Sequence, residues 1–284
     1  MAVLLVVAVV GALVLSTLRR HLSPILIGTG CVVRASYSLP LSTGQAAIAA
    51  TIAGVAQRRS MPARAVAIAY ATALQESDLA DLPYGDRDSV GVFQQRPSQG
   101  WGPRADLLDP AYASGKFFAA LAEVPGYLNL PIYQAAQDVQ HSADGSAYAQ
   151  WATMGADLAT GFTGSASRSV WCWYGTGVTG PAHLASAIGE LGHVFGRLAT
   201  GQSGPGITLV QASPATAGLA TVRVAAPASG WTVAAWLVTH ADQYGIRKVR
   251  YAGYQWTASA GQAGWTRLAS SSQIGSTDAA VAFG

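Results

Sequence analysis

Apolar residues recur at helical spacing through much of the first half of the chain. From Ser42 they return every three or four positions to about Gln57, and Ser42 with Gln45 forms the Ser-x-x-Gln pattern of a capping box. Pro62 begins a second helix, which ends near Glu76, because proline is favoured at the first helical position. Further helices are expected after a cap or a proline, from Asp109-Pro110, from Pro131 and over Ala147–Thr160.

The pattern changes at two places. Between Asp78 and Arg104 no helical period is present, and the Asp, Gly, Pro, Ser and Gln content predicts a long irregular loop. Beyond residue 206, alternating positions predict strands around one amphipathic helix over Trp231–Tyr244. The expected strands are Thr208–Gln211, Ala220–Ala225, Ile246–Tyr251, Gln255–Thr257 and Ala279–Phe283.

The chain begins with an unbroken apolar run, Ala2–Leu15. This run fits either a marginal membrane helix, which needs about 20 residues, or the core of a signal peptide. Arg19 and Arg20 follow the run and, under the positive-inside rule, would place the remainder in the cytoplasm. We expect a membrane anchor with the bulk of the chain on the extracytoplasmic side, and a cytoplasm-facing membrane protein is the alternative.

These patterns divide the chain into five segments: 1–18 as anchor or signal, 19–41 as linker, 42–161 as a mainly helical domain, 162–206 as a linker with one helix, and 207–284 as a small α/β domain. Their charges are uneven, since 1–41 carries +3, 42–161 carries −4 and 162–284 carries +4. Half of the residues are hydrophobic and 11% are charged, which excludes a disordered chain. The total of +3 is too weak to indicate nucleic-acid binding.

The chain has two cysteines, Cys31 and Cys172. An even count in an exported protein indicates a disulfide, which would join the two ends of the helical domain. Two free buried thiols are the alternative.

Glu76, one of three glutamates, lies at the end of an apolar helix, just before the irregular loop. Partial burial disfavours the charged form of a carboxyl group, as a general acid at neutral pH requires. The loop that follows is rich in Gln, Ser and Tyr, whose side chains bind sugar hydroxyls without carrying charge. Tyr84, Phe93 and Trp101 are candidates for stacking on sugars, although aromatic residues near such loops more often belong to a core.

Two short motifs carry a resemblance to a known family. Gln75-Glu76-Ser77, followed at the family's separation by Gly91–Pro97 (Gly-Val-Phe-Gln-Gln-Arg-Pro), resembles the signature of soluble lytic transglycosylases and goose-type lysozymes. The segment 42–161 also resembles actinobacterial membrane-anchored wall proteins. The nearest match to the later Tyr-Asn-x-Gly motif of transglycosylases is Ser146–Trp151, which lacks the asparagine.

The resemblance implies a lysozyme-like fold, peptidoglycan glycan strands as the substrate and Glu76 as the catalytic acid. Asp86 is a possible second carboxylate, which would favour hydrolysis over closure of an anhydro ring. An inactive wall-binding or scaffold protein that keeps the fold is the alternative function. The expected substrate-binding residues are Ser77, Tyr84, Asp88, Gly91, Gln94 and Gln95.

The C-terminal segment has a fainter resemblance to a domain related to zinc D,D-carboxypeptidases. Those domains end in a strand that bears His-x-His ligands, whereas the strand Ala279–Phe283 has alanines at these positions. Because zinc needs lone-pair donors, we expect no metal here and no cofactor elsewhere. The basic balance of this segment would suit an anionic wall polymer, and a solvated basic sheet face is the plainer interpretation.

Overall fold

The structure, a computed structural model, has a mixed α/β architecture. It describes residues 28–142, 144–175, 177–178, 180–196, 208–210, 220–224, 226–269 and 280–284. The anchor or signal expected at 1–18 lies outside these residues. Within the described ranges, no helix is both long and apolar enough to cross a membrane.

Six α-helices and two short 3-10 helices form the part of the chain that contains the long loop. They are α2 (Thr43–Arg58), α3 (Ala63–Ser77), η1 (Pro97–Gln99), α4 (Arg104–Leu107), α5 (Pro110–Glu123), α6 (Ile132–Gln140), η2 (Gly145–Trp151) and α7 (Ala152–Phe162). The predicted capping box is confirmed, because the Gln45 amide donates to Ser42 Oγ (3.2 Å) and the Ser42 amide donates to Gln45 Oε1 (3.0 Å). The helix expected over Ala147–Thr160 instead starts as the 3-10 turn η2 and continues as α7.

A small antiparallel sheet has the strand order β2 (Ser38–Leu41), β1 (Thr29–Arg34), β3 (Val170–Tyr174). Two of these strands lie in 19–41 and the third in 162–206, so both stretches expected as linkers contain sheet strands. All five residues of β3 are buried, and this burial stabilises a strand despite the Gly, Ser and Thr residues around it.

The predicted disulfide is confirmed, and the alternative of two free thiols is wrong. Cys31 on β1 lies directly opposite Cys172 on β3, and the two side chains are bonded. Both residues are fully buried.

The second sheet is also antiparallel, in the order β4-β5-β9-β6-β7-β8. Its strands are β4 (Thr208–Val210), β5 (Ala220–Arg223), β6 (Lys248–Tyr251), β7 (Tyr254–Thr257), β8 (Thr266–Arg267) and β9 (Ala280–Phe283). It is accompanied by α8 (Leu184–Phe195), α9 (Pro227–Thr239), α10 (Ala241–Tyr244) and the 3-10 helix η3 (Ala258–Ala263). All five predicted strands are therefore present. The helix predicted over Trp231–Tyr244 starts earlier, at Pro227, and is divided in two. It was expected to be amphipathic, but every residue of α9 from Gly230 to Thr239 is buried, because the helix is packed on all sides.

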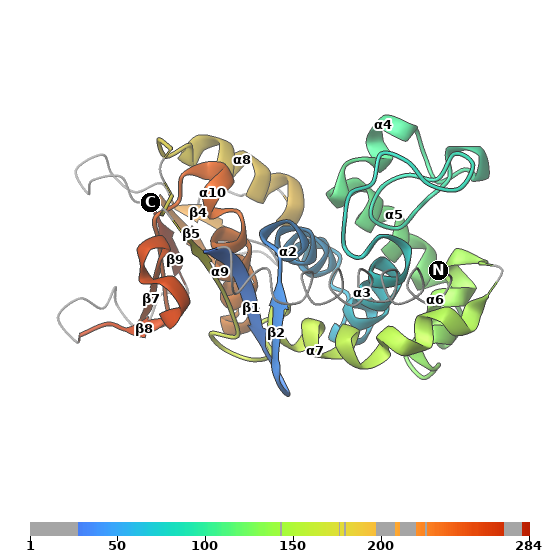
Figure 1. Ribbon diagram of the computed structural model, residues 1–284, viewed down its shortest axis with the longest axis horizontal. Coiled ribbons are helices and arrows are strands. Elements are labelled where there is room, and N and C mark those ends of the chain that lie inside the picture. The colour runs from blue at the N-terminus through green and yellow to red at the C-terminus, as the bar shows by residue number, and fades with distance from the viewer. Residues whose placement is uncertain are drawn as a thin grey trace, which may run out of the picture.

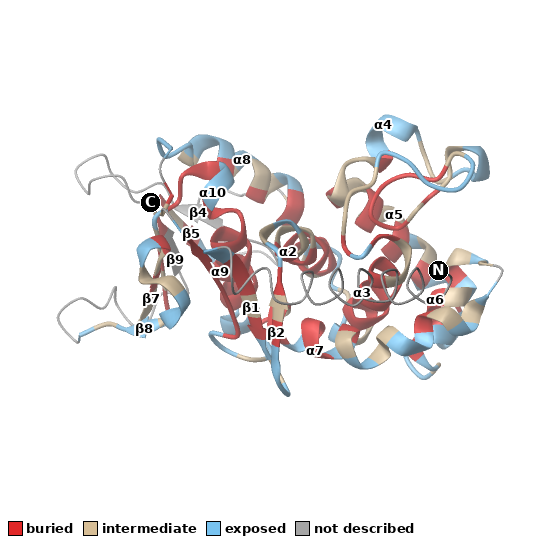
Figure 2. Ribbon diagram, viewed as in Figure 1, coloured by how far each residue is buried: buried red, intermediate tan, exposed pale blue. Residues whose placement is uncertain are grey.

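One hydrophobic core runs through both parts of the molecule. Figure 1 shows α2 between the helices α3 to α7 on one side and the strands with α9 on the other, and α2 contacts both α5 and α9. In Figure 2 the ribbons of α3 and α9 are largely red, the colour of buried residues. Strand β3 of the first sheet is linked to the second sheet by a side chain, because Trp256 Nε1 of β7 donates to the carbonyl of Cys172 (2.8 Å).

Small residues let α3 and α7 approach closely. A Cβ at Gly155 of α7 would lie 2.7 Å from the carbonyl oxygen of Ala67 and 3.0 Å from the amide nitrogen of Ala71, both on α3. Alanine and glycine at this crossing therefore fix how the end of α3, which carries Glu76, lies relative to η2 and α7.

Candidate functional site

The carboxylate of Glu76 is held by side chains from two other segments. Glu76 is half-buried in the last turn of α3. Its Oε1 accepts hydrogen bonds from the Tyr148 hydroxyl of η2 (2.6 Å) and from Gln140 Nε2 at the end of α6 (3.1 Å). Among the described residues, no hydrogen bond reaches Oε2. One oxygen is thus fixed in position, and the other has no protein partner in the described part of the chain.

Tyr148 is suited to remain a hydrogen-bond donor at neutral pH. It is almost fully buried. This burial, together with its hydrogen bond to Glu76, raises the pKa of Tyr148 well above its usual value. The phenol therefore stays protonated and keeps its hydrogen bond to the carboxylate.

Gln140 connects Glu76 to the loop motif. Its Nε2 also donates to the carbonyl of Phe93 (2.8 Å), within the run Gly91–Pro97. The two motifs that carry the family resemblance are therefore joined through this amide. A single glutamine at a helix end gave no signal in the sequence.

The stretch Ser146–Trp151, noted in the sequence as the nearest match to a transglycosylase motif, contacts the Gln75-Glu76 pair. Besides the Tyr148 contact, Trp151 Nε1 and Gln150 Nε2 both donate to Gln75 Oε1, at 2.9 and 3.1 Å. The asparagine is absent, but this stretch lies where it positions the end of α3.

Two of the expected substrate-binding residues form hydrogen bonds inside the protein. Ser77 Oγ donates to the carbonyl of Val92 (2.7 Å) and accepts from the amide of Ala80 (3.2 Å). Gln95 is buried, and its Nε2 donates to the carbonyl of Ala113 (3.2 Å). In this structure these side chains hold the loop against α3 and α5.

The tip of the loop contains three further expected site residues, Gly91, Gln94 and Tyr84. Gly91 has a φ of +76°, and a Cβ there would lie 2.3 Å from the carbonyl oxygen of Leu107, so only glycine fits. Gln94 is half-buried and donates from Nε2 to the carbonyls of Gly91 (3.2 Å) and Tyr84 (3.3 Å). The Tyr84 residue is 68% exposed.

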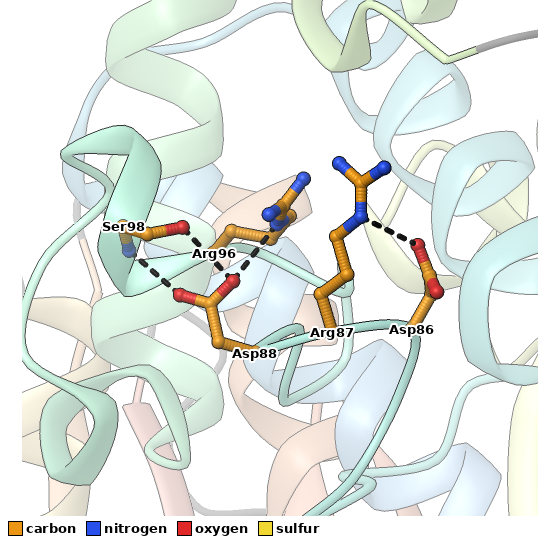
Figure 3. Close-up of polar contacts among 5 residues, drawn as sticks. All are labelled: Asp86, Arg87, Asp88, Arg96 and Ser98. Atoms are coloured by element: carbon orange, nitrogen blue, oxygen red, sulfur yellow. Dashed lines mark hydrogen bonds and ion pairs between the residues drawn. The ribbon is translucent and has the colours of Figure 1, made fainter.

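The two loop aspartates differ in their surroundings (Figure 3). Asp88 accepts hydrogen bonds from Arg96 Nε (2.9 Å), the Ser98 amide (2.7 Å) and Ser98 Oγ (2.9 Å). These donors, Arg96 above all, hold the pKa of Asp88 well below its usual range. The Asp86 side chain is 89% exposed and lies 3.9 Å from Arg87 Nε. Asp88 therefore braces the loop, and Asp86 faces solvent beside a cation.

A groove of about 930 Å³ shares Gln140 with the Glu76 site. Its other lining residues include Gln99 of η1, Trp101 shortly after it, Val124 after α5, and Asp138 and His141 near the end of α6. The volume is at the upper end of the range of about 300–1,000 Å³ that is usual for ligand pockets. The two amides, the carboxylates of Glu123 and Asp138 and the partly buried indole are groups that can hydrogen-bond to and stack on a sugar chain.

His193 and His240 lie apart from this site, whereas His141 lines the groove. His193 Nε2 lies 2.7 Å from Asp109 Oδ2 and so links α8 to α5. His240 is buried and stacks on Trp236, and this burial lowers its pKa to about 4. Within the described residues, no three His, Cys, Asp or Glu side chains form a group that could hold a metal ion.

No protein-family model matches the chain, and the search of curated proteins found no match either.

Proposed function

We propose that the protein is an exported, membrane-tethered enzyme that cleaves the glycan strands of peptidoglycan. On this proposal residues 42–161 form a lysozyme-like domain, and Glu76 is its general acid and base. The observation that carries the proposal is the arrangement of the Glu76 carboxylate. Its Oε1 is fixed by Tyr148 and by Gln140, which also lines the groove, and its Oε2 has no protein partner among the described residues. The paired motifs at Gln75–Ser77 and Gly91–Pro97 support the same assignment.

The reaction needs one group that first gives and then takes a proton. Protonated Glu76 gives its proton to the glycosidic oxygen as the bond from that oxygen to the anomeric carbon breaks. The carboxylate then takes the proton of the 6-hydroxyl of the muramic residue, whose oxygen attacks the anomeric carbon and closes an anhydro ring. Tyr148 and Gln140 keep the carboxylate in position through both steps.

The two loop aspartates favour this anhydro-forming route over hydrolysis. Most hydrolysing glycosidases need a second free carboxylate to activate water or to act as nucleophile. Asp88 is already bound by Arg96 and Ser98, and Asp86 lies exposed beside Arg87. Neither loop aspartate therefore acts as the second carboxylate in the proposed mechanism, and Glu76 carries both proton transfers.

Export is supported by the disulfide between Cys31 and Cys172. Disulfides persist in oxidising compartments and are rare in the cytosol. We propose that the apolar run Ala2–Leu15 anchors the chain and that the remainder lies on the extracytoplasmic side. A periplasmic reporter fused after residue 40 should be active, and an inactive fusion would instead support the cytoplasm-facing alternative.

The proposal is tested by digesting purified cell walls with the wild-type chain, with Glu76→Gln and with Glu190→Gln as a matched control on α8. Mass spectrometry of the soluble products should show anhydro-muramic ends for the wild type and the control, and none for Glu76→Gln. Reducing ends would indicate hydrolysis instead. Equal release by the wild type and Glu76→Gln would show that Glu76 is not the catalytic group.

The second candidate is a wall-binding protein without turnover. It is favoured by the internal hydrogen bonds of Ser77 and Gln95, which leave these side chains fewer groups to offer a substrate. Sedimentation with insoluble wall but no released fragments would support this function. A chain that neither binds nor cleaves the wall would exclude both candidates.

A further inference from the structure

A second pocket, separate from the Glu76 site, has two arginines in its lining. Its volume is about 220 Å³, and it lies where the first sheet meets η3. Arg34 comes from the end of β1 and Arg168 from the turn before β3. The amide of Arg34 donates to the carbonyl of Ser169 (2.7 Å), which brings these two segments together.

Aromatic rings support both arginine side chains. The guanidinium carbon of Arg34 lies 5.0 Å from the centre of the Trp171 ring, and that of Arg168 lies 4.3 Å from the centre of the Tyr254 ring. Such stacking holds the guanidinium while its N–H groups stay available in their plane. Neither arginine forms an ion pair with any described residue.

The described lining of this pocket contains no acidic side chain and has several hydrogen-bond donors. Trp171 is 8% exposed, and its indole N–H has no acceptor among the described residues. The Gln262 amide adds another donor group. Arg168 also has a φ of +58°, a strained backbone conformation for a residue other than glycine that is often retained at binding sites. A ligand with several acceptor oxygens and negative charge would complement this set.

We propose that this pocket binds an oxyanion, either a phosphate or a carboxylate group, of an anionic ligand. The planar guanidinium fork matches both groups with paired hydrogen bonds. A volume of about 220 Å³ accommodates one such group with its nearest atoms, since a water molecule occupies about 30 Å³ in the liquid. Arg34 and Arg168 are exposed, so the rest of the ligand extends into solvent. The proposal does not depend on catalysis by Glu76.

The test is calorimetric titration of the full chain, at constant low ionic strength, with inorganic phosphate, glycerol 3-phosphate and D-glucuronate, and with uncharged D-glucose as the control ligand. At least one anion should bind saturably and glucose should not. A preference for the phosphates or for glucuronate identifies which oxyanion the site takes. Arg34→Gln and Arg168→Gln should each weaken binding about tenfold or more, a change of at least about 1.4 kcal/mol.

Two matched variants separate specific recognition from general charge or folding effects. Arg59→Gln removes the same charge at an exposed position after α2, and it should bind as the wild type does. Arg34→Lys and Arg168→Lys keep the charge but lose the fork, so they should bind less tightly than the wild type with an unchanged melting temperature. Glu76→Gln should bind normally whether or not the wall is cleaved. Absence of saturable binding by every anion, or unchanged binding in both Arg→Gln variants, would overturn the proposal.

Discussion

The disulfide closes a loop of the chain that contains all residues of the Glu76 site. Loss of this bond should therefore strongly lower the stability of the protein. Cys31 and Cys172 are separated by 141 residues, and the segment between them contains every helix from α2 to α7. In the loop-entropy treatment, a crosslink of this separation destabilises the unfolded chain by about 5 kcal/mol at 25 °C. For a chain of this size, that difference corresponds to a melting temperature lower by about 10 °C.

The measurement is urea denaturation of the wild type, followed by fluorescence, after unfolding and refolding with and without a reductant. The reduced chain should unfold at a lower urea concentration and with a larger m-value, because its unfolded state exposes more surface. The double variant Cys31→Ala/Cys172→Ala should be destabilised similarly, and the reductant should leave its denaturation curve unchanged. This variant separates loss of the crosslink from direct effects of the reductant.

An unchanged urea midpoint in the reduced wild type, with two free thiols per chain confirmed by titration, would refute this reasoning. It would mean that the pairing of β1 with β3 persists in the unfolded chain or contributes little to its free energy. A bridge that does not form in air-oxidised protein would refute the compartment argument as well, because the proposal of export depends on this bond.

Three further perturbations test the packing, electrostatics and chemistry of the site. Gly155→Ala places a Cβ 2.7 Å from the carbonyl oxygen of Ala67 and should lower the free energy of unfolding, measured in urea, by about 1–3 kcal/mol. Gly189→Ala, whose Cβ would lie in open space, should raise the free energy of unfolding by up to about 1 kcal/mol. Equal effects of the two variants would contradict the close crossing of α3 and α7. Burial, with a smaller effect from Asp109, raises the pKa of Asp81 to about 6. The folded state therefore favours protonated Asp81, and the stability that protonation contributes at acid pH should be lost as the pH rises from about 4 to 6. The urea midpoint should fall over the same range in the wild type and should not fall in Asp81→Asn. A fall that persists in Asp81→Asn would mean that another group titrates. Tyr148→Phe removes one of the two hydrogen bonds to Glu76, so it should slow the release of wall fragments about tenfold and alter the pH profile of that release. An unchanged rate and pH profile would show that this bond does not position the carboxylate.

The elements were largely predictable because their signals are local. The capping box at Ser42, the cap at Asp109 and the alternation in 207–284 each correspond to an observed helix start or strand. Strand β3 was not predictable, because its short apolar run lies among Gly, Ser and Thr, and its pairing with β1 brings together residues 141 positions apart. Local hydrophobic patterns carry no information about a partner so distant in the sequence, and only the pair of cysteines linked these two segments.

The candidate site, too, was predictable only in part. The motif at Gln75–Ser77 placed Glu76 at a helix end, and the structure agrees. The roles of Gln140 and Tyr148 depend on α6 and η2 folding back onto α3, which no spacing in the sequence encodes. Asp88 was expected to bind substrate because it is a loop carboxylate close to the second motif. In the structure its three hydrogen bonds to Arg96 and Ser98 give it a structural role instead.

The basic C-terminal segment is tied to the helical part by more than chain connectivity. Trp256 donates to the carbonyl of Cys172, Trp265 Nε1 donates to the carbonyl of Val170 (2.8 Å), and the Tyr174 hydroxyl donates to the carbonyl of Val238 (2.8 Å). All three bonds involve β3, the strand that also carries half of the disulfide. A ligand held by Arg34 and Arg168 would therefore contact the same rigid framework that carries α3. The C-terminal segment adds Gln262 to this pocket and the Tyr254 ring beneath Arg168, so on the proposal above an anionic group bound there would keep a fixed position relative to Glu76.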